Sequence, residues 1–193
     1  MIISLIRHGR PAVDYWTRIS AAEFDAWLAA YGEADVDGSL PPPPELRDAL
    51  SDCGLVITSR SRRALRSAEM LGLSARRVVM DDVGETPLPR KFPWPVAMAP
   101  LSFMVLARIL WHFGAANGLE TRREAVDRAR RLALRLETLA GESGHVAVVG
   151  HGYLHRFTAA ALRNSGWSRT RTGRGYWSLS QFQKPDAGAA GSG

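Results

Sequence analysis

The amino-acid sequence predicts an α/β fold, a three-layer α/β/α sandwich with a mostly parallel sheet. Short runs of apolar, often β-branched residues alternate with longer amphipathic segments, which is the order expected of parallel strands joined by helices. The runs end in Gly, Ser or Asp, as buried parallel strands do. A length of 193 residues with 46% hydrophobic content suits one domain that buries a sizeable core.

Five segments are predicted to be strands. Four short apolar runs have the composition of buried parallel strands; they are Ile2–Ile6, Leu55–Thr58, Val78–Met80 and His145–Val149. The fifth, Tyr176–Phe182, alternates large and polar residues. This alternation predicts an edge strand near the C-terminus with one face in solvent.

Capping residues and glycines mark the predicted helices. The capping boxes Ser20–Glu23 and Thr121–Glu124 predict two helix starts, with ends at Gly32 and Gly141. A third helix is predicted over Arg62–Leu71, where apolar residues share one face.

Two proline-containing segments interrupt this alternation. Pro41–Pro44 predicts a rigid stretch that leads into a short helix ending at Asp52. Pro87–Gly114 is an insertion that contains Leu101–Phe113, which is apolar on nearly every face. Such a helix is usually buried between neighbours or covers a pocket. The insertion is therefore expected near the functional site as a lid, as a homodimer interface or as additional core.

Composition limits the compartment and the partners. The single cysteine, Cys53, excludes an intramolecular disulfide and is typical of a reducing compartment, so a cytoplasmic protein is expected. No stretch is long and apolar enough for a membrane span. The net charge of +6 comes almost entirely from arginine and favours anionic ligands. We predict one domain over residues 1–184 and a disordered Gly/Ala-rich tail over 185–193.

One basic stretch, Arg163–Arg174, has tryptophan and tyrosine beside its arginines, a pattern that also occurs in nucleic-acid-binding surfaces. A solvated loop before the edge strand is the favoured interpretation. No nucleic-acid partner is expected.

Polar residues follow four of the predicted strands. Because ligands of doubly wound folds bind at the carboxyl ends of the strands, these residues are expected to converge there. They are Arg7, His8 and Gly9 after the first strand, Arg63 after the second, Glu85 beyond the third, and His151 and Gly152 after the fourth.

Phosphoryl transfer through an enzyme nucleophile requires groups of these kinds. A neutral imidazole has a free lone pair at neutral pH, so His8 suits the nucleophile. Gly9 allows the backbone and the substrate to approach closely. Arg7 and Arg63 are always charged and match phosphate in shape.

The remaining groups suit the phosphate oxygens and the leaving group. His151 can donate a hydrogen bond to the same oxygens, and Gly152 can offer its N–H at the start of a helix. Glu85 can give a proton to the leaving alkoxide.

Taken in order, these motifs resemble the histidine phosphatase superfamily, in its phosphoglycerate mutase-like branch. The resemblance spans residue 3 to about residue 160 and rests on Leu5–Gly9, Thr58-Ser59 with Arg63-Ala64, Glu85 and Val148–Gly152. It implies that His8 is the phosphorylated nucleophile and that Glu85 is the acid–base residue. It also implies a phosphate pocket of Arg7, Arg63 and His151, with no metal and no other cofactor.

The sequence departs from the mutases after the first motif. Arg10-Pro11 follows it, and Asp14 stands where the mutases have an asparagine. A carboxylate beside phosphate is repelled, so Asp14 is excluded from the site. The longer insertions of the mutases are also missing, which favours a phosphatase. Among the arginines of the second motif, the spacing favours Arg63 over Arg60.

We therefore predict an enzyme that hydrolyses a small phosphorylated substrate. Two alternatives remain open: a phosphoprotein phosphatase acting on phosphohistidine, and a catalytically silent phosphate-binding regulatory module. A cysteine phosphatase is excluded because Ser59 stands where the loop arginine after Cys53 is required. The spacing of His151 and His155 can chelate zinc on a helix, but no third ligand is near, so no metal site is expected.

Overall fold

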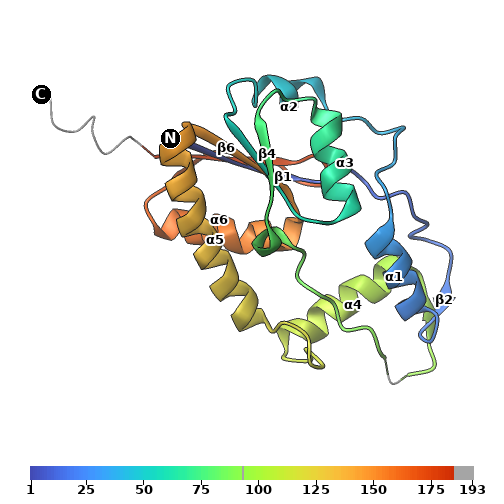
Figure 1. Cartoon of the computed structure of the whole chain (residues 1–193). Coiled ribbons are helices and arrows are strands. Elements are labelled where there is room, and N and C mark those ends of the chain that lie inside the picture. The colour runs from blue at the N-terminus through green and yellow to red at the C-terminus, as the bar shows by residue number, and fades with distance from the viewer. Residues whose placement is uncertain (93, 185–193) are drawn as a thin grey trace, which may run out of the picture.

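The computed structural model describes residues 1–92 and 94–184, and its centre is a six-stranded sheet (Figure 1). The strands are β1 (Ile2–Arg7), β3 (Leu55–Thr58), β4 (Arg76–Val79), β6 (His145–Gly150), β7 (Ser168–Arg171) and β8 (Leu179–Gln183). They lie in the order β4-β3-β6-β1-β8-β7. The first four of these pair in parallel, and β8 and β7 are added antiparallel beside β1.

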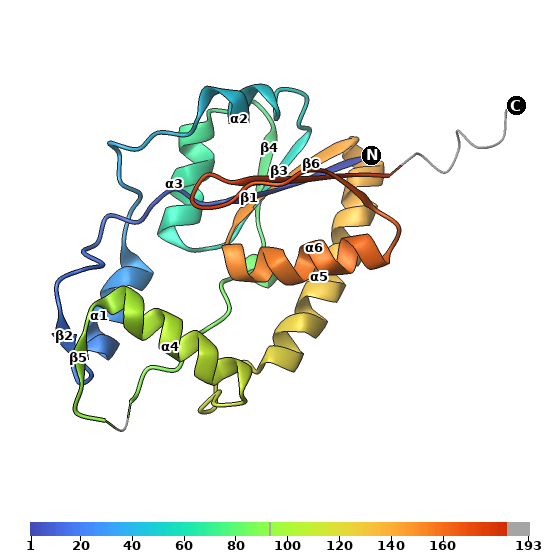
Figure 2. The ribbon, with the colours of Figure 1, turned by 180° about the vertical axis from the view of Figure 1, so that it is seen from behind.

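Helices cover both faces of the sheet, as Figures 1 and 2 show from opposite sides. One face packs against α5 (Arg122–Ser143) and α6 (Gly152–Asn164), and the other against α2 (Pro44–Asp48) and α3 (Arg62–Leu71). Alternate residues of β6 explain the two cores, since Val148 belongs to the first and Val149 to the second. The predicted three-layer sandwich with a mostly parallel sheet is confirmed.

Two further helices lie beside the sandwich rather than on the sheet. They are α1 (Phe24–Glu33) and α4 (Pro100–His112), accompanied by the two-stranded ribbon of β2 (Ile19–Ser20) and β5 (Ala97–Met98). The rings of Phe24 and Phe103 lie 5.0 Å apart and join the two helices. A 3₁₀-helix, η1 (Asp81–Val83), leads from β4 towards this part of the chain.

The predicted position of the edge strand was wrong. Trp177 has a positive φ of 56° and its N–H donates to the carbonyl of Arg7, so the strand begins only at Leu179. The resulting β8 pairs on both sides, and β7 is the edge. All residues of β7 are exposed and it has no apolar alternation, so its sequence showed no strand pattern.

Several predicted boundaries also shift. The hydrogen bonds of the Ser20–Glu23 capping box form, but they close a turn, and the helix starts at Phe24. The second capping box, Thr121–Glu124, caps α5 as predicted, and α5 continues past Gly141 to Ser143. The short helix after the prolines ends at Asp48 instead of Asp52, and the third strand covers Arg76–Val79. The tail 185–193 lies outside the described residues.

The helix of the insertion is buried on one face only, so of the two placements that its composition predicts, burial between neighbours on all sides is wrong. Phe103, Ala107 and Trp111 are buried, whereas Val105 and Ile109 are about half exposed.

Among residues 1–92 and 94–184, no helix is both long and apolar enough to cross a membrane.

Candidate active site

His8 lies immediately after β1, where the parallel strands end, and its side chain is buried. Its Nδ1 lies 2.7 Å from the carbonyl oxygen of Gly9. A carbonyl only accepts hydrogen bonds, so Nδ1 carries the proton. Nε2 therefore has the free lone pair, and it accepts a 3.2 Å hydrogen bond from Nε of Arg63.

The charge state of His8 follows from its surroundings. Burial, then the neighbouring His151 and Arg63, hold the pKa of His8 well below its usual 6.5. Each of these factors disfavours a positive charge on the ring. His8 is thus a neutral imidazole at neutral pH, with Nε2 directed towards a cation.

Arg63 is the arginine of the second motif that enters the site. Ser61 caps the N-terminus of α3, accepting a hydrogen bond from the N–H of Ala64 at 3.3 Å, and this places Arg63 in the first turn. The Arg63 side chain is buried, and Nη1 donates to the carbonyls of Tyr31 and Gly32, each at 3.1 Å.

The neighbouring arginines bind carboxylates and do not contact His8. Arg60 forms an ion pair with Asp81 at the edge of the smaller of the two site cavities, and Arg62 forms one with Asp35; both arginine side chains are largely exposed. The structure thus brings Arg63, and not Arg60, next to His8.

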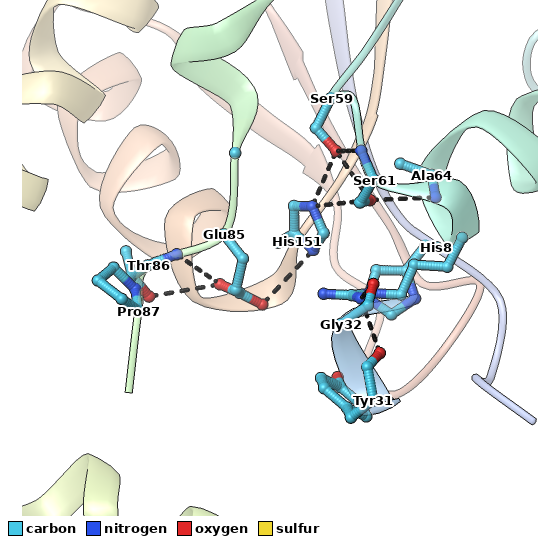
Figure 3. Close-up of polar contacts among 12 residues, drawn as sticks. His8, Tyr31, Gly32, Ser59, Ser61, Ala64, Glu85, Thr86, Pro87 and His151 are labelled. Carbon is cyan, nitrogen blue, oxygen red and sulfur yellow. Dashed lines mark hydrogen bonds and ion pairs between the residues drawn. The ribbon is translucent and has the colours of Figure 1, made fainter. Parts of the chain in front are cut away.

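His151 directly follows β6, is the N-cap residue of α6 and is fully buried. Its ring lies 5.1 Å from that of His8 in an edge-on arrangement. Nε2 lies 2.9 Å from the hydroxyl of Ser59 and 3.3 Å from that of Ser61 (Figure 3). Burial and the charge of Arg63 hold the pKa of His151 well below 6.5, so this ring is neutral too.

The second ring nitrogen of His151 faces Glu85. Nδ1 of His151 lies 3.6 Å from Oε2 of Glu85 and has no hydrogen-bond partner in the described part of the chain (Figure 3). Oε1 of Glu85 accepts from the N–H of Thr86 at 3.0 Å. The buried imidazole and the carboxylate thus face each other at 3.6 Å.

The loop that carries Glu85 is held by two arginines. Arg128 of α5 donates to the carbonyls of Asp82 and Gly84, both at 2.8 Å. Arg108 of α4 donates to the carbonyl of Thr86 at 3.0 Å. The carboxylate is therefore positioned from both α4 and α5.

The predicted phosphate-binding residues Arg7 and Gly152 lie together. A Cβ on Gly152 would lie 3.1 Å from Cδ of Arg7, so glycine leaves room for the arginine side chain. The Arg7 guanidinium stacks on the ring of Tyr176 at 4.1 Å. Gly152 is the first residue of α6, where backbone N–H groups are unpaired and attract anions.

Gly9 is placed differently from the prediction. Its N–H donates to the hydroxyl of Ser67 at 2.9 Å. A Cβ at this position would lie 2.5 Å from Val36 and 2.6 Å from Trp177. Glycine is required here by close packing, and the N–H is not free for a phosphate.

Two cavities meet at Glu85. The larger, of about 560 Å³, is lined by Arg7, Gly152 and residues of α4. The smaller, of about 260 Å³, is lined by Arg63, His151 and Ser59. Glu85 lines both, so a phosphate bound near the histidines can have its ester group in the larger cavity.

Sequence reasoning missed several residues that shape this site. Ser59 was part of a recognised motif but was given no role, although its hydroxyl contacts His151. Tyr31, Tyr176 and Arg108 come from α1, the loop before β8 and α4. None of the three lies in a motif, so only packing between distant segments reveals them.

The remaining histidines lie outside this arrangement. His155 is buried and burial lowers its pKa to about 4. His145 bonds to Ser4 and Asp52, and His112 contacts Tyr153. In residues 1–92 and 94–184 no group of three or more His, Cys, Asp or Glu side chains is arranged to hold a metal ion.

Solved structures with the same architecture identify the fold. A protein encoded by an open reading frame of Mycobacterium tuberculosis superimposes with a TM-score of 0.60 over 96% of this chain and 92% of its own, at 19% identity. A mycobacterial glucosyl-3-phosphoglycerate phosphatase gives 0.59 over 96% and 91%, at 20% identity. The chain has the histidine phosphatase fold.

A more distant neighbour shares this histidine phosphatase fold. The phosphoserine phosphatase of Entamoeba histolytica, in complex with 3-phosphoglyceric acid, gives a TM-score of 0.54 over 94% of this chain and 90% of its own, at 13% identity. No protein-family model matches the sequence, and no curated protein matches it significantly. At such low identities the likeness concerns the fold alone.

Proposed function

We propose that the chain is a phosphatase that hydrolyses a small phosphomonoester through a phosphohistidine on His8, without a metal ion. One observation carries the proposal. The proton of His8 is held on Nδ1 by the Gly9 carbonyl, which leaves the Nε2 lone pair beside the Arg63 guanidinium. A phosphate attracted to that cation meets a nucleophile that needs no deprotonation.

In the first step, Nε2 of His8 forms a bond to phosphorus as the P–O bond to the leaving group breaks. The electrons of that bond move to the leaving oxygen, and Glu85 transfers its proton there, so an alcohol departs. Arg63 and Arg7 offset the negative charge of the phosphoryl oxygens. The Gly9 carbonyl stabilises the positive charge that develops on the His8 ring.

In the second step, water hydrolyses the phosphohistidine. The Glu85 carboxylate takes a proton from the water as its oxygen attacks phosphorus. The N–P bond breaks, its electrons return to Nε2, and inorganic phosphate leaves. His151 is the proposed donor to the phosphoryl oxygens, because its ring lies 5.1 Å from that of the nucleophile His8.

The neighbours support a phosphatase rather than a phosphate-binding module, since two of the three described above are phosphatases by name. Cations already surround the phosphate position, so no metal charge is required there. The apolar wall of α4 narrows the larger cavity and favours a small ester over a phosphoprotein.

The test is a screen of the purified chain against phosphorylated metabolites and phosphohistidine peptides, with and without EDTA. We expect turnover of a small ester that EDTA does not reduce. His8→Ala should abolish it, and His112→Ala, an exposed histidine, serves as the matched control. Acid-sensitive label from the substrate should be trapped on wild type and not on His8→Ala.

Three results contradict the proposal. Turnover by His8→Ala equal to wild type excludes the nucleophile. Loss of activity in EDTA that zinc or magnesium restores excludes the metal-free mechanism. Phosphate binding without any turnover supports the regulatory module.

A further inference from the structure

A long segment near the C-terminus, residues 143–184, is devoid of acidic residues. Residues 143–184 contain five arginines and one lysine but no aspartate or glutamate. A basic run of this length without acids gives α6 and the β7–β8 hairpin a locally positive field. In Figure 2 both elements lie on one side of the molecule, α6 in orange and the last strands in red.

Part of this region forms a groove of about 340 Å³ between α6 and the chain around β7 and β8. Among the described residues, five arginines line it: Arg7, Arg156, Arg163, Arg169 and Arg174. No carboxylate of residues 1–92 or 94–184 lines it. We call it the arginine groove.

The arginine groove joins the active site. It shares Arg7, Gly152, Arg156 and Arg174 with the larger of the two cavities described above. Arg7 and Gly152 are the residues proposed to bind the phosphate that is transferred. A ligand whose phosphate lies against Arg7 and Gly152 can therefore extend into the groove.

The arginines of the groove form no ion pair with an acid among residues 1–92 and 94–184. Within the described part of the chain none of its five arginines has a carboxylate within 4.0 Å, whereas Arg60, Arg90 and Arg128 elsewhere do. Some rest on aromatic rings instead, as Arg156 does on Tyr153 at 5.5 Å and Arg169 on Phe182 at 5.3 Å. Stacking orders a guanidinium and leaves its N–H donors for an anion.

We infer that the arginine groove binds a second anionic group of the substrate. The chain would thus act on phosphomonoesters that carry a further phosphate or carboxylate. This inference rests on the proposed phosphatase function and names the class of substrate within it. Like charges that line one groove repel one another where, as in the described part of this chain, no carboxylate pairs with them, and a bound anion relieves that repulsion. A groove of about 340 Å³ suits a small molecule rather than a nucleic acid.

The experiment compares three esters with the same alkyl chain: butyl phosphate, butanediol bisphosphate and the phosphate ester of hydroxybutyrate. Wild type should prefer one or both anionic esters over butyl phosphate in kcat/KM, and the pair separates phosphate from carboxylate recognition. In the double variant Arg156→Gln/Arg174→Gln this preference should fall about tenfold or more, since a charged hydrogen bond contributes roughly 1.5–3 kcal/mol and 1.4 kcal/mol is tenfold.

The matched control is Arg76→Gln/Arg77→Gln. It removes the same two charges from exposed positions on β4, at the opposite edge of the sheet. The control should keep the wild-type preference, which separates a groove effect from a change in net charge. If both double variants keep the preference for anionic esters over butyl phosphate, or if both lose it equally, the inference is overturned.

Binding separates this inference from the proposed catalysis. Butane bisphosphonate, whose P–C bonds cannot be hydrolysed, should bind wild type more tightly than the Arg156→Gln/Arg174→Gln variant in calorimetry. If no ester is turned over but this difference persists, the groove assignment stands and the phosphatase proposal fails. If the double variant loses only the binding of a single-stranded oligonucleotide, the groove is a nucleic-acid site and the inference is overturned.

Discussion

At the scale of single residues, the site combines neutral nucleophilic groups with permanent cations. His8 and His151 are buried side by side, and burial lowers the pKa of each well below 6.5. Arg63 donates to His8 and lowers the pKa of both histidines further. Neutral imidazoles beside guanidinium groups attract a phosphate without forming ion pairs among themselves.

Glu85 is the residue whose proposed role depends on the leaving group. Glu85→Gln should reduce kcat on alkyl phosphates by about 10²–10³-fold, and much less on aryl phosphates, because phenolates leave without protonation. Parallel kinetics on both ester types measure the difference. Glu142→Gln removes an exposed carboxyl of α5 and is the control. Equal losses on alkyl and aryl esters would assign the acid to another residue.

The burial of His155 is expected to lower the stability of the fold in acid. Its pKa is lowered from 6.5 to about 4 by burial. Below pH 6.5 the unfolded chain binds a proton at this position that the folded chain does not, so stability falls with pH until about pH 4. His155→Gln removes this contribution. Between pH 8 and pH 4 the free energy of unfolding should fall by up to about 3 kcal/mol less in the variant than in wild type.

Urea unfolding of both proteins at a series of pH values checks this prediction. Comparing each protein with itself at pH 8 cancels any packing change caused by the substitution. Curves for wild type and variant that run parallel over the whole range would show that His155 is not buried in its neutral form.

At the scale of elements, α4 serves two purposes with its two faces. The buried face is core, with Phe103 fully enclosed between Phe24 and Phe92. Met104 and Val105 line the larger cavity, and Arg108 holds the loop of Glu85. This placement supports the lid and core interpretations of the insertion. The homodimer interpretation stays a prediction that mass measurements in solution can test.

Two substitutions in α4 separate its faces. Phe103→Ala should destabilise the fold by about 3–5 kcal/mol, because it leaves a cavity in the aromatic cluster. Val105→Ala should change stability by less than about 0.5 kcal/mol, since the side chain is 53% exposed. Val105→Ala should instead change KM for bulky esters. Denaturant unfolding and kinetics measure both effects, and equal destabilisation by the two changes would contradict this division.

At the scale of the whole molecule, charge is distributed unevenly around the sheet. The site lies at the carboxyl ends of β1, β3 and β6, and the acid-free segment continues from it over α6 and β7. An anionic substrate is therefore attracted to the side of the molecule that contains the site.

This charge distribution predicts a dependence on salt. Raising ionic strength from about 10 mM to about 150 mM shortens the Debye length from roughly 30 Å to 8 Å. We expect kcat/KM for anionic esters to fall about tenfold over this range. The Arg156→Gln/Arg174→Gln variant should show a shallower slope than wild type. Steady-state kinetics over a salt series measure both slopes, and identical slopes would exclude steering by these arginines.

The sequence by itself determined the layers of this protein and which strand ends carry its polar residues. β-branched runs and capped amphipathic helices are local patterns, and parallel strands must end at one edge of a sheet. His8, Arg63, Glu85 and His151 could therefore be expected to meet, and the structure places them together. Their roles in catalysis remain the prediction that the experiments above address.

Only the tertiary structure decided features that depend on contacts between distant segments. The order of β7 and β8 reverses a local expectation. The packing that requires Gly9 and the arginine groove each join residues more than twenty-five positions apart. A local pattern reports how much of an element is buried, but not which neighbour buries it. Strand pairing and the lining of a pocket are set by the packing of the whole chain, so they cannot be deduced from the sequence of one segment.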